Sequence, residues 1–572
     1  MFLPSPTPMK RKLSRRNFVK AAVATAAGSG FSGSSIFGQT EPPIQLGSPS
    51  PRGSRRILYV SDPSSIARNY LPDPVSEDDL RNWVDRLASA KVDLFIQEAY
   101  TQGWTTYWRS KRFQYDARPQ HRRFLPLLDQ DIQPLEVLLN QSHRRRMTFL
   151  AGIRMNDNHG HVSTRQGVGA GADFLMNNPQ WHLKDHPRGP YFGMSDRLDF
   201  SFVQVRDHLL SVTEELVDQF DVDGLELCFR DHQYFPVGKG VERGKLMTEL
   251  LSRIRQMLEK KGRKRRKKLL LGARVFQTFQ DCRSLGLEVP VWIRKGLIDY
   301  VSPADTMYCE PNASHEEFSR LCRPSKCLLY PGILPWSSIR MRRRLGGRPI
   351  TLEQQRAVAM NMYAAGADGI FFYNHFVTLS WSPFYPHLLH DLAETRNPPD
   401  LFRGSRHYLF EPIWSGCLGF GPDGTTSTGR VNAYRMVLNR GTRKSQGRYR
   451  FRVCEHIANS RGASLLFRAY HATPQDYLKV SINGTPIPKG DLHRRSNESR
   501  SDLKAVVDPN STTSSGLPPV PELPGPFSTF WFDLKKPPAK FGDNWLEVRL
   551  MDSDLGASKN IVIDEVEVFV SA

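Results

Sequence analysis

The sequence predicts an α/β fold, a (β/α)8 TIM barrel followed by an all-β, jelly-roll-like sandwich. Two observations support this prediction. Between residues 55 and 398, short apolar runs alternate with segments whose apolar residues recur every three or four positions, as in a parallel sheet covered by helices. From residue 403 to residue 572 the apolar runs are short and alternating, and turn residues separate them, which is typical of a sandwich.

The N-terminal segment predicts export. Arg15 and Arg16 precede the apolar stretch 21–27, a pattern that resembles a twin-arginine signal. The stretch is too short and too rich in Ala and Gly to span a bilayer as a stable helix. We expect residues 1–38 to be the signal peptide and residues 39–54 a linker. The mature protein is then periplasmic or secreted, without an integral membrane segment; a basic disordered tail is the alternative interpretation.

Eight apolar runs predict the eight barrel strands. They are residues 57–61, 92–98, 148–154, 224–229, 269–275, 298–303, 327–332 and 369–373. Helix starts lie between them, because Ser76 precedes three acidic residues and Thr351 forms a capping box with Gln354. A doubly wound open sheet is the competing fold, but no glycine-rich phosphate loop follows the first run.

The stretch 221–231 is the centre of the predicted site. An amphipathic helical pattern leads into the apolar run 224–229, so we expect a strand parallel to its neighbours. Because side chains alternate along a strand, one set should point into the barrel and the other should pack under helices. The first set is Glu226, Cys228 and Arg230, and the second is Leu225, Leu227 and Phe229.

Turn and loop signals divide the second region, residues 403–572. Asn483 and Gly484 follow an alternating run and predict a tight hairpin turn. The segment 496–526 is dense in Ser, Asp and Pro, and we expect it to be a long loop. Residues 403–572 are therefore expected to form the sandwich as a separate domain.

The net charge and the cysteine content limit the classes of binding partner that the sequence predicts. The net charge of +21 favours anionic partners. The basic run 260–268 is expected to be an exposed loop on the N-terminal face of the barrel, either merely solvated or attracted to an acidic polysaccharide. It has no interleaved aromatic residues, so no nucleic-acid partner is predicted. The seven cysteines show no zinc spacing, and the sequence leaves open whether the close pair Cys322 and Cys327 is bonded.

Polar residues cluster at the C-terminal ends of the predicted strands, where barrel enzymes hold their active sites. Hydrolysis of a glycosidic bond needs one protonated and one ionised carboxyl group. Glu226 and Asp305 are the predicted catalytic pair. Glu226 is alternatively a substrate hydrogen-bonder or part of a structural ion pair, and Asp305 is alternatively a helix N-cap. Glu98 and Asp231 compete for the same catalytic role. The predicted substrate-binding residues are Glu98, Arg154, Asn156, Asp157, His159, Arg230, Asp231, Arg274, Tyr330, Trp336 and Asn374. Other strand-end residues that converge there are Asp62, Tyr373 and His375.

Aromatic residues of the adjoining loops are expected to rim this face, because sugar rings stack on aromatic surfaces. They are Trp104, Tyr107, Trp108, Trp181, Tyr234, Trp336 and Trp381. Asp157, His159 and His161 form an Asp-x-His-x-His cluster, for which zinc is an alternative ligand. No further ligand can be named from spacing, so neither a metal nor a cofactor is predicted.

Four segments carry a resemblance to a known group. They are residues 154–159, 198–200, 221–227 and 366–370. Through them, the region from about residue 55 to residue 396 resembles the secreted, glycosyl-hydrolase-like TIM barrels similar to family-10 glycosyl hydrolases. The second region resembles the non-catalytic β-domains that such barrels often carry. The resemblance implies an exported glycoside hydrolase with a poly- or oligosaccharide as its partner.

Two positions depart from that pattern. Cys228 stands where related barrels commonly carry a further acidic residue, and Arg230 stands where chitinase-like barrels carry a catalytic glutamate. A chitinase mechanism is therefore not expected. A second hypothesis stays open, namely a non-catalytic carbohydrate-binding protein built on a barrel that has lost one carboxylate. The sequence indicates neither the sugar nor the linkage, because fold does not determine reaction.

Overall fold

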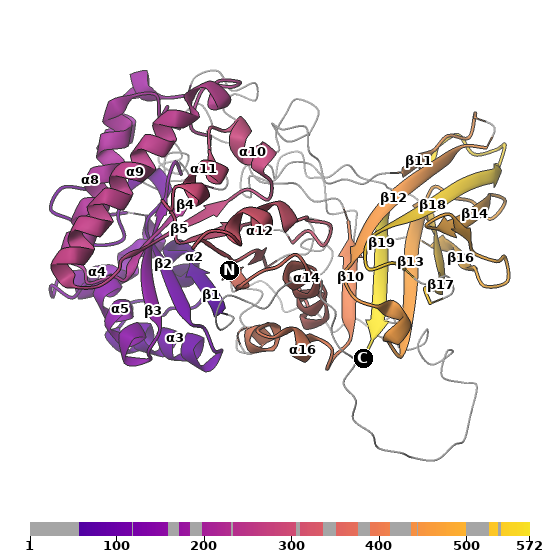
Figure 1. Ribbon diagram of the computed structural model, residues 1–572, viewed down its shortest axis with the longest axis horizontal. Coiled ribbons are helices and arrows are strands. Elements are labelled where there is room, and N and C mark those ends of the chain that lie inside the picture. Colours follow the sequence, from indigo (N-terminus) through magenta and orange to yellow (C-terminus); the bar gives the residue numbers. More distant parts are fainter. Residues whose placement is uncertain are drawn as a thin grey trace, which may run out of the picture.

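The protein contains a helix-covered parallel sheet and a region of antiparallel sheets (Figure 1). The computed structural model describes residues 56–116, 118–157, 171–183, 197–229, 233–304, 309–335, 350–375, 389, 391–411, 436–442, 444–498, 526–535 and 539–572. The predicted signal peptide and linker lie outside these residues. None of the described helices is both long and apolar enough to cross a membrane.

The parallel sheet has nine strands in the order β7-β6-β5-β4-β3-β2-β1-β9-β8. Their bounds are β1 (Arg56–Ser61), β2 (Leu94–Tyr100), β3 (Thr148–Arg154), β4 (Gly224–Cys228), β5 (Leu270–Val275), β6 (Tyr300–Pro303), β7 (Leu328–Leu329), β8 (Gly332–Ile333) and β9 (Gly369–Tyr373). The predicted alternation of strands and helices is confirmed. The predicted run 327–332 is divided between β7 and β8, because Pro331 has no N–H to continue the ladder.

Helices lie between the strands. They are α2 (Pro63–Asn69), α3 (Glu77–Ser89), α4 (Leu125–Leu128), α5 (Pro134–Arg144), α7 (Asp173–Met176), α8 (Val203–Gln219), α9 (Gly240–Arg265), α10 (Phe279–Ser284), α11 (Val289–Arg294), α12 (Glu316–Cys322), α14 (Leu352–Ala364) and α16 (Pro398–Leu401). Ser76 caps α3, and the predicted capping box of Thr351 and Gln354 begins α14. Cys322 and Cys327 are buried thiols and are not bonded to each other.

The basic run 260–268 is not the loop that the sequence predicted. Residues 260–265 form the last turns of α9, and Arg266 ends the helix in a left-handed conformation. Cations at this end of a helix interact favourably with its unpaired carbonyl groups. Four of the basic side chains also bind acidic residues. Lys261 pairs with Asp218, Arg265 and Lys267 pair with Asp221, and Lys268 pairs with Asp299.

The two faces of the parallel sheet belong to different cores. Leu225, Leu227 and Phe229 pack in the large core beneath the helices, as the alternation predicted. The opposite face forms a smaller core of its own, and Leu58, Ile96 and Leu150 are among its members. The opposite face is therefore apolar over its lower layers, and the polar residues described below are confined to the C-terminal ends of the strands.

Four aspartates form the same arrangement at the N-terminal edge of the sheet. Each lies just before a strand, and its carboxylate accepts a hydrogen bond of 2.7–2.9 Å from the backbone N–H of the second residue of an earlier strand. The pairs are Asp93 with Ile57, Asp223 with Phe149, Asp299 with Leu271 and Asp368 with Leu329. The aspartate N–H groups donate back to the carbonyls of the same four partners. These carboxylates satisfy strand-end donors that would otherwise be buried without partners.

Replacing Asp368 by alanine should therefore destabilise the protein by about 1–3 kcal/mol, the usual cost of a buried donor left unsatisfied. Asp93→Ala should cost less, because the Asp93 side chain is 34% exposed and water can replace it, whereas Asp368 is only 6% exposed. Urea denaturation of the two variants measures this order. A smaller loss in Asp368→Ala than in Asp93→Ala would contradict it.

The second region consists of two antiparallel sheets. One has the order β10-β19-β13-β17-β16, with β11 also pairing with β19, and the other has the order β12-β18-β14-β15. The strands are β10 (Arg406–Phe410), β11 (Met436–Leu438), β12 (Gln446–Val453), β13 (Gly462–Tyr470), β14 (Tyr477–Ile482), β15 (Thr485–Pro486), β16 (His493–Glu498), β17 (Phe527–Asp533), β18 (Gly542–Asp552) and β19 (Ile561–Ser571).

Both antiparallel sheets contribute to one hydrophobic core, as Phe467 and Val568 from one sheet and Phe451 and Val548 from the other illustrate. The predicted turn at Asn483 and Gly484 is confirmed, since both residues have positive φ between β14 and β15. Most of the predicted loop 496–526 lies outside the described residues.

The parallel sheet and the antiparallel region meet at α14. Ala357 of this helix belongs to the antiparallel core. The Asn361 amide donates to the carbonyls of Pro311 (2.8 Å) and Arg452 (3.0 Å), and its oxygen accepts a bond from the Cys454 N–H (2.9 Å). Three backbone groups, from the segment before α12 and from the end of β12, thus converge on one side chain.

Candidate active site

The C-terminal ends of β2 to β5 carry charged residues on the inner face of the sheet. In register, Glu98 lies beside Gly152, then Glu226, Gly272 and Tyr300. The next layer holds Arg154, Cys228, Arg274 and Ser302. The glycines make room for this arrangement, since a Cβ at Gly272 would lie 2.0 Å from the Tyr300 ring. Carboxylates and arginines therefore occupy alternate layers.

Arg154 binds three carboxylates. Its Nε donates to Glu98 (2.7 Å), while its two terminal nitrogens donate to Asp157 (2.6 Å) and Asp62 (3.0 Å). It also donates to the Tyr373 hydroxyl (2.5 Å). Burial alone would lower the pKa of Arg154, but Glu98, Tyr373, Asp62 and Asp157 raise it well above the usual range. Arg154 is therefore a permanent cation that joins β1, β2, β3 and β9.

Arg274 is the second cation of the cluster and is fully buried. It donates to the other Glu98 oxygen (2.5 Å), and its Nε lies 3.2 Å from Glu226 Oε1. Its guanidinium also faces the Tyr373 ring at 5.0 Å. The other Glu226 oxygen accepts a 3.1 Å bond from the Tyr300 hydroxyl, and burial together with Glu226 raises the pKa of Tyr300. Glu98 therefore links the two arginines.

Asp62 lies at the mouth of this cluster, just after β1. It caps α2, because its carboxylate accepts bonds from the N–H groups of Ser64 (2.8 Å) and Ser65 (3.4 Å). Burial would raise its pKa, but Arg154 and Arg118 more than offset that effect and lower it. Asp62 therefore stays ionised, with a side chain that is 6% exposed.

A neighbouring polar network was not predicted from the sequence. The Ser64 hydroxyl lies 2.7 Å from His121 Nε2, and it accepts a 2.8 Å bond from Arg118. Arg118 also binds Asp116 through Nε (2.9 Å), and Asp116 lies 3.3 Å from the same His121 nitrogen. Because serine and aspartate both face Nε2, the histidine cannot relay a proton between its two nitrogens as in a serine hydrolase. We interpret the network as support for Asp62.

Acidification should lower the free energy of unfolding through His121. Burial, then Arg118, lower its pKa to about 4, although Asp116 and Asp62 act in the opposite direction. The unfolded chain takes up a proton near pH 6.5 and the folded chain does not, so the contribution is complete above pH 6.5 and is lost as pH falls towards 4. The loss should reach about 3 kcal/mol.

Urea denaturation of the wild type and His121→Gln between pH 7 and pH 4 measures this contribution. His208, His315 and His375 also have pKa values lowered to about 4 by burial, so the informative quantity is the difference between the two proteins. Parallel pH profiles would show that His121 is not the group that titrates.

The other predicted site residues fall into three groups. Tyr330 and Asn374 border the cluster. The Tyr330 ring lies 5.6 Å from the Tyr300 ring, and the Asn374 oxygen accepts a bond from the Asp62 N–H (3.0 Å). Asn156 instead holds backbone, because its amide donates to Leu198 and Gln233 carbonyls and its oxygen accepts a bond from the Leu198 N–H. The remaining residues lie outside the described part of the chain; they are His159, Arg230, Asp231, Asp305 and Trp336.

The predicted aromatic rim is largely wrong. Trp104, Tyr107, Trp108 and Tyr234 are buried in the large outer core, and Trp181 packs against it. Three of these rings lie in the segment after β2, and their burial in the core assigns them to packing. Trp336 and Trp381 lie outside the described residues.

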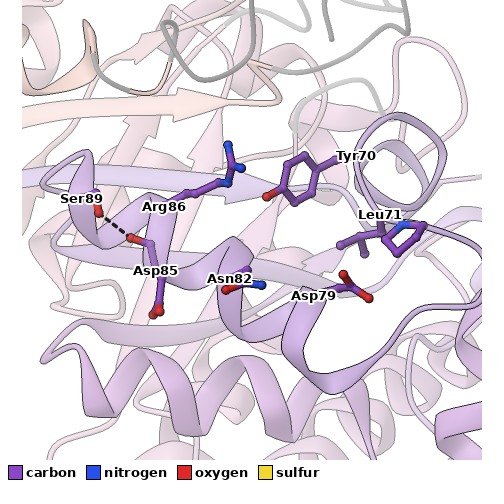
Figure 2. A pocket seen from close by; sticks show the side chains of 8 residues that line it. Tyr70, Leu71, Asp79, Asn82, Asp85, Arg86 and Ser89 are labelled. Atoms are coloured by element: carbon purple, nitrogen blue, oxygen red, sulfur yellow. Dashed lines mark hydrogen bonds between the residues drawn. The ribbon is translucent and has the colours of Figure 1, made fainter. Parts of the chain in front are cut away.

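No group of three potential metal ligands occurs among the described residues. His159 and His161 are not among them, so the predicted alternative of a zinc site at the Asp-x-His-x-His cluster lies outside the described residues. A hollow of about 590 Å³ lies elsewhere, between the end of α2 and α3, and is lined by Tyr70, Asn82, Asp85 and Arg86 (Figure 2). It lies at the end of α2, whereas Asp62 caps the start of that helix, and none of its lining residues belongs to the charged cluster, so we assign it no chemistry.

Comparison with known proteins yields similarity of architecture alone. No family model matches, and no curated protein is similar in sequence. Three solved structures illustrate the similarity. An α-L-fucosidase isoenzyme 2 from Paenibacillus thiaminolyticus has a TM-score of 0.39 at 12% identity, over 60% of this chain and 49% of the fucosidase. An α-amylase from Geobacillus thermoleovorans has a TM-score of 0.37 at 10% identity, over 87% and 99% of the two chains.

A glycoside hydrolase family 20 β-N-acetylglucosaminidase has a TM-score of 0.36 at 11% identity, over 62% of this chain and 72% of that one. This chain thus spans about half the length of the fucosidase. At these TM-scores the similarities assign neither a reaction nor a substrate.

Proposed function

We propose that the chain is an exported glycoside hydrolase that acts on a poly- or oligosaccharide at the C-terminal ends of its parallel strands. The observation that supports this proposal is the cluster of Asp62, Glu98, Asp157 and Glu226 on two buried arginines. Burying six charges is costly, and such clusters concentrate at functional sites. Their place at the strand ends is where barrel enzymes perform their chemistry.

The proposal includes a closed (β/α)8 barrel. Two facts support closure through β7 and β8 as halves of one strand. β7 pairs with β6 while β8 pairs with β9, and only two residues separate them. The Tyr330 N–H donates to Val301 (3.0 Å), and the Phe371 N–H donates to Pro331 (3.0 Å). If β7 and β8 count as one strand, the four aspartates precede every second strand, which fits a ring of eight strands. The shared core of the two antiparallel sheets supports a sandwich in the second region.

Within this site we assign different roles to the carboxylates. Asp62 is the ionised group that meets the substrate, because arginines keep it charged at the mouth of the cluster. Asp305, placed by the sequence after β6, remains the candidate for the protonated acid. Glu226 is fully buried beneath Cys228, so we give it a positioning role for Arg274 and Tyr300 in place of direct catalysis.

The test of this function is a screen of the mature protein on polysaccharides, with uronate-bearing and sulfated polymers included. Release of reducing ends from at least one polymer is the expected result. Binding of several polymers without cleavage of any would overturn the proposal.

One observation favours a second function, a non-catalytic carbohydrate-binding protein. All four carboxylates of the described cluster contact an arginine, and ion pairing keeps carboxylates ionised. Hydrolysis needs one protonated acid. If Asp305 does not supply that acid, the cluster can hold a sugar but cannot cleave it.

Export is proposed to depend on Arg15 and Arg16. A twin-arginine signal requires both side chains, so replacing both by lysine should leave full-length precursor in the cytoplasm. Fractionation and immunoblotting of wild type and variant measure this outcome. Unchanged export of the lysine variant would overturn the assignment.

A further inference from the structure

The outer face of the four-stranded sheet carries charged and aromatic residues in register. Tyr449, Val480 and Val548 point into the core, so their neighbours along β12, β14 and β18 face outwards. We call four of these outward residues the cationic face; they are Arg448, Lys479, Trp545 and Arg549.

Arg448 and Trp545 form an exposed cation–π pair. The guanidinium carbon lies 4.4 Å from the centroid of the indole ring, and its Nε lies 3.2 Å from Glu547. The Arg448 side chain is 59% exposed, and its terminal nitrogens make no hydrogen bond to any described residue. A guanidinium held over an aromatic ring by its π face, with its terminal donors exposed, can bind a carboxylate or a sulfate through those donors.

A second pair of cations lies one rung along the sheet. Arg549 stands opposite Lys479 on β14 and Gln446 on β12, and it donates twice to the Gln446 side chain (3.1 and 2.6 Å). Lys479 is exposed and pairs with no acidic residue of the described chain. Arg549 lies two positions after Glu547, the partner of Arg448, along β18, so the two cationic rungs are roughly 7 Å apart.

The strip ends in another aromatic–cation pair. Tyr477, two residues before Lys479, is 41% exposed, and the Lys489 ammonium lies 5.6 Å from its ring centroid. Glu547 is the acidic residue paired with the face, against three cations. This excess of positive charge, spread with aromatic rings along several rungs of the sheet, suits an extended anionic chain better than a small ligand.

The face borders the sheet end that carries the charged cluster. Farther along β12, Arg450 donates to the Asn312 carbonyl (2.6 Å), and Arg452 pairs with Glu316 at the start of α12. Asn312 lies in residues 309–315, which connect the C-terminal end of β6 to α12. A polymer lying on the cationic face is therefore directed towards that end of the parallel sheet.

We propose that the cationic face binds the chain of an anionic polysaccharide, through its carboxylate or sulfate groups. That this polymer is also the substrate rests on the proposed function, whereas binding to the face does not. Binding is measured without turnover, so an inactive barrel and a non-binding face give different results.

The test compares the full chain with two triple variants that lose the same charge. One is Arg448→Gln, Lys479→Gln and Arg549→Gln on the cationic face; the control is Lys260→Gln, Arg263→Gln and Lys264→Gln on exposed positions of α9. Titration calorimetry with polygalacturonate, dextran sulfate, neutral dextran and a DNA duplex, in 150 mM NaCl, gives the affinities. Trp545→Leu removes the flat ring without changing charge.

We expect at least a tenfold loss of affinity for polygalacturonate, dextran sulfate or both in the face variant, less than a twofold loss in the control, and an intermediate loss in Trp545→Leu. The polymer affected identifies carboxylate or sulfate as the bound group. Equal losses in both triple variants would overturn the proposal in favour of general attraction to a basic protein. Absence of binding to both anionic polysaccharides, or equally face-dependent binding of DNA, would also overturn it.

Discussion

Asp62→Asn should lower kcat on the cleaved glycan by about 10²–10⁴-fold, the usual contribution of a carboxylate that transfers a proton. Asparagine is also a good helix N-cap, so it can accept the bonds from Ser64 and Ser65 while the charge beside Arg154 is lost. KM should change little, because the side chain keeps its shape. Steady-state kinetics on the polymer found by the screen provide the measurement.

The matched control is Asp79→Asn, which changes another carboxylate in the first turn of a helix, away from the cluster. It should keep wild-type turnover. If a correctly folded Asp62→Asn protein also kept wild-type turnover, Asp62 would not meet the substrate. A loss of turnover with the same loss in thermal stability would instead assign Asp62 to structure.

Glu98→Gln should destabilise the protein by about 3–5 kcal/mol, the cost of breaking a buried ion pair by removing one partner. Glu98 accepts a bond from Arg154 with one oxygen and from Arg274 with the other, and all three side chains are buried. The neutral amide cannot compensate either cation, and its NH2 group faces an arginine. Urea denaturation measures the difference in the free energy of unfolding.

Glu242→Gln is the control for this substitution, because Glu242 pairs with Lys239 on the exposed start of α9. Its unfolding midpoint should match that of the wild type. A Glu98→Gln protein as stable as the wild type would mean that the two arginines do not need this carboxylate, and the charged cluster would lose its link between β3 and β5.

The sequence predicted the cluster better than its surroundings. Strand alternation placed Glu98, Arg154, Glu226 and Arg274 on one face near the strand ends, and the structure joins these four residues by direct contacts. Period-two alternation fixes the face of every residue in a strand, so inward charges are visible from the sequence alone.

The connections between strands were predicted less well. Arg118 and His121 follow β2 in a segment without periodicity, and no pattern there indicates which way a side chain points. The spacing of Asp116 and Arg118, two residues apart, was the available signal of a local ion pair. Trp104 and Trp108 were predicted to be exposed loop aromatics, but both are buried in the outer core. Burying a large aromatic ring stabilises the folded protein, and no sequence pattern in this segment indicated that these rings point inward.

The basic run 260–268 is a third place where the prediction from the sequence was wrong. Charge density alone indicated a loop, yet Lys and Arg have good helix propensity, and apolar residues such as Leu258 anchor α9 from within the preceding turn. A run of charged residues indicates that the segment is exposed to solvent. The recurrence of apolar residues over the whole segment is the better indicator of its secondary structure.

The helix α14 has a consequence for how such proteins can be recombined. A helix that exposes one side to solvent can form the boundary of a domain. In α14, however, nine of the thirteen residues are buried, and the helix contacts both the parallel sheet and β10. A binding module on a flexible tether can be exchanged between genes at its linker without harm to either part. Here an exchange near residue 403 would expose Ala357 and remove the backbone groups of Arg452 and Cys454 that Asn361 binds. The two regions are therefore expected to be inherited as one unit, and grafting either onto a foreign partner would require redesign of this helix.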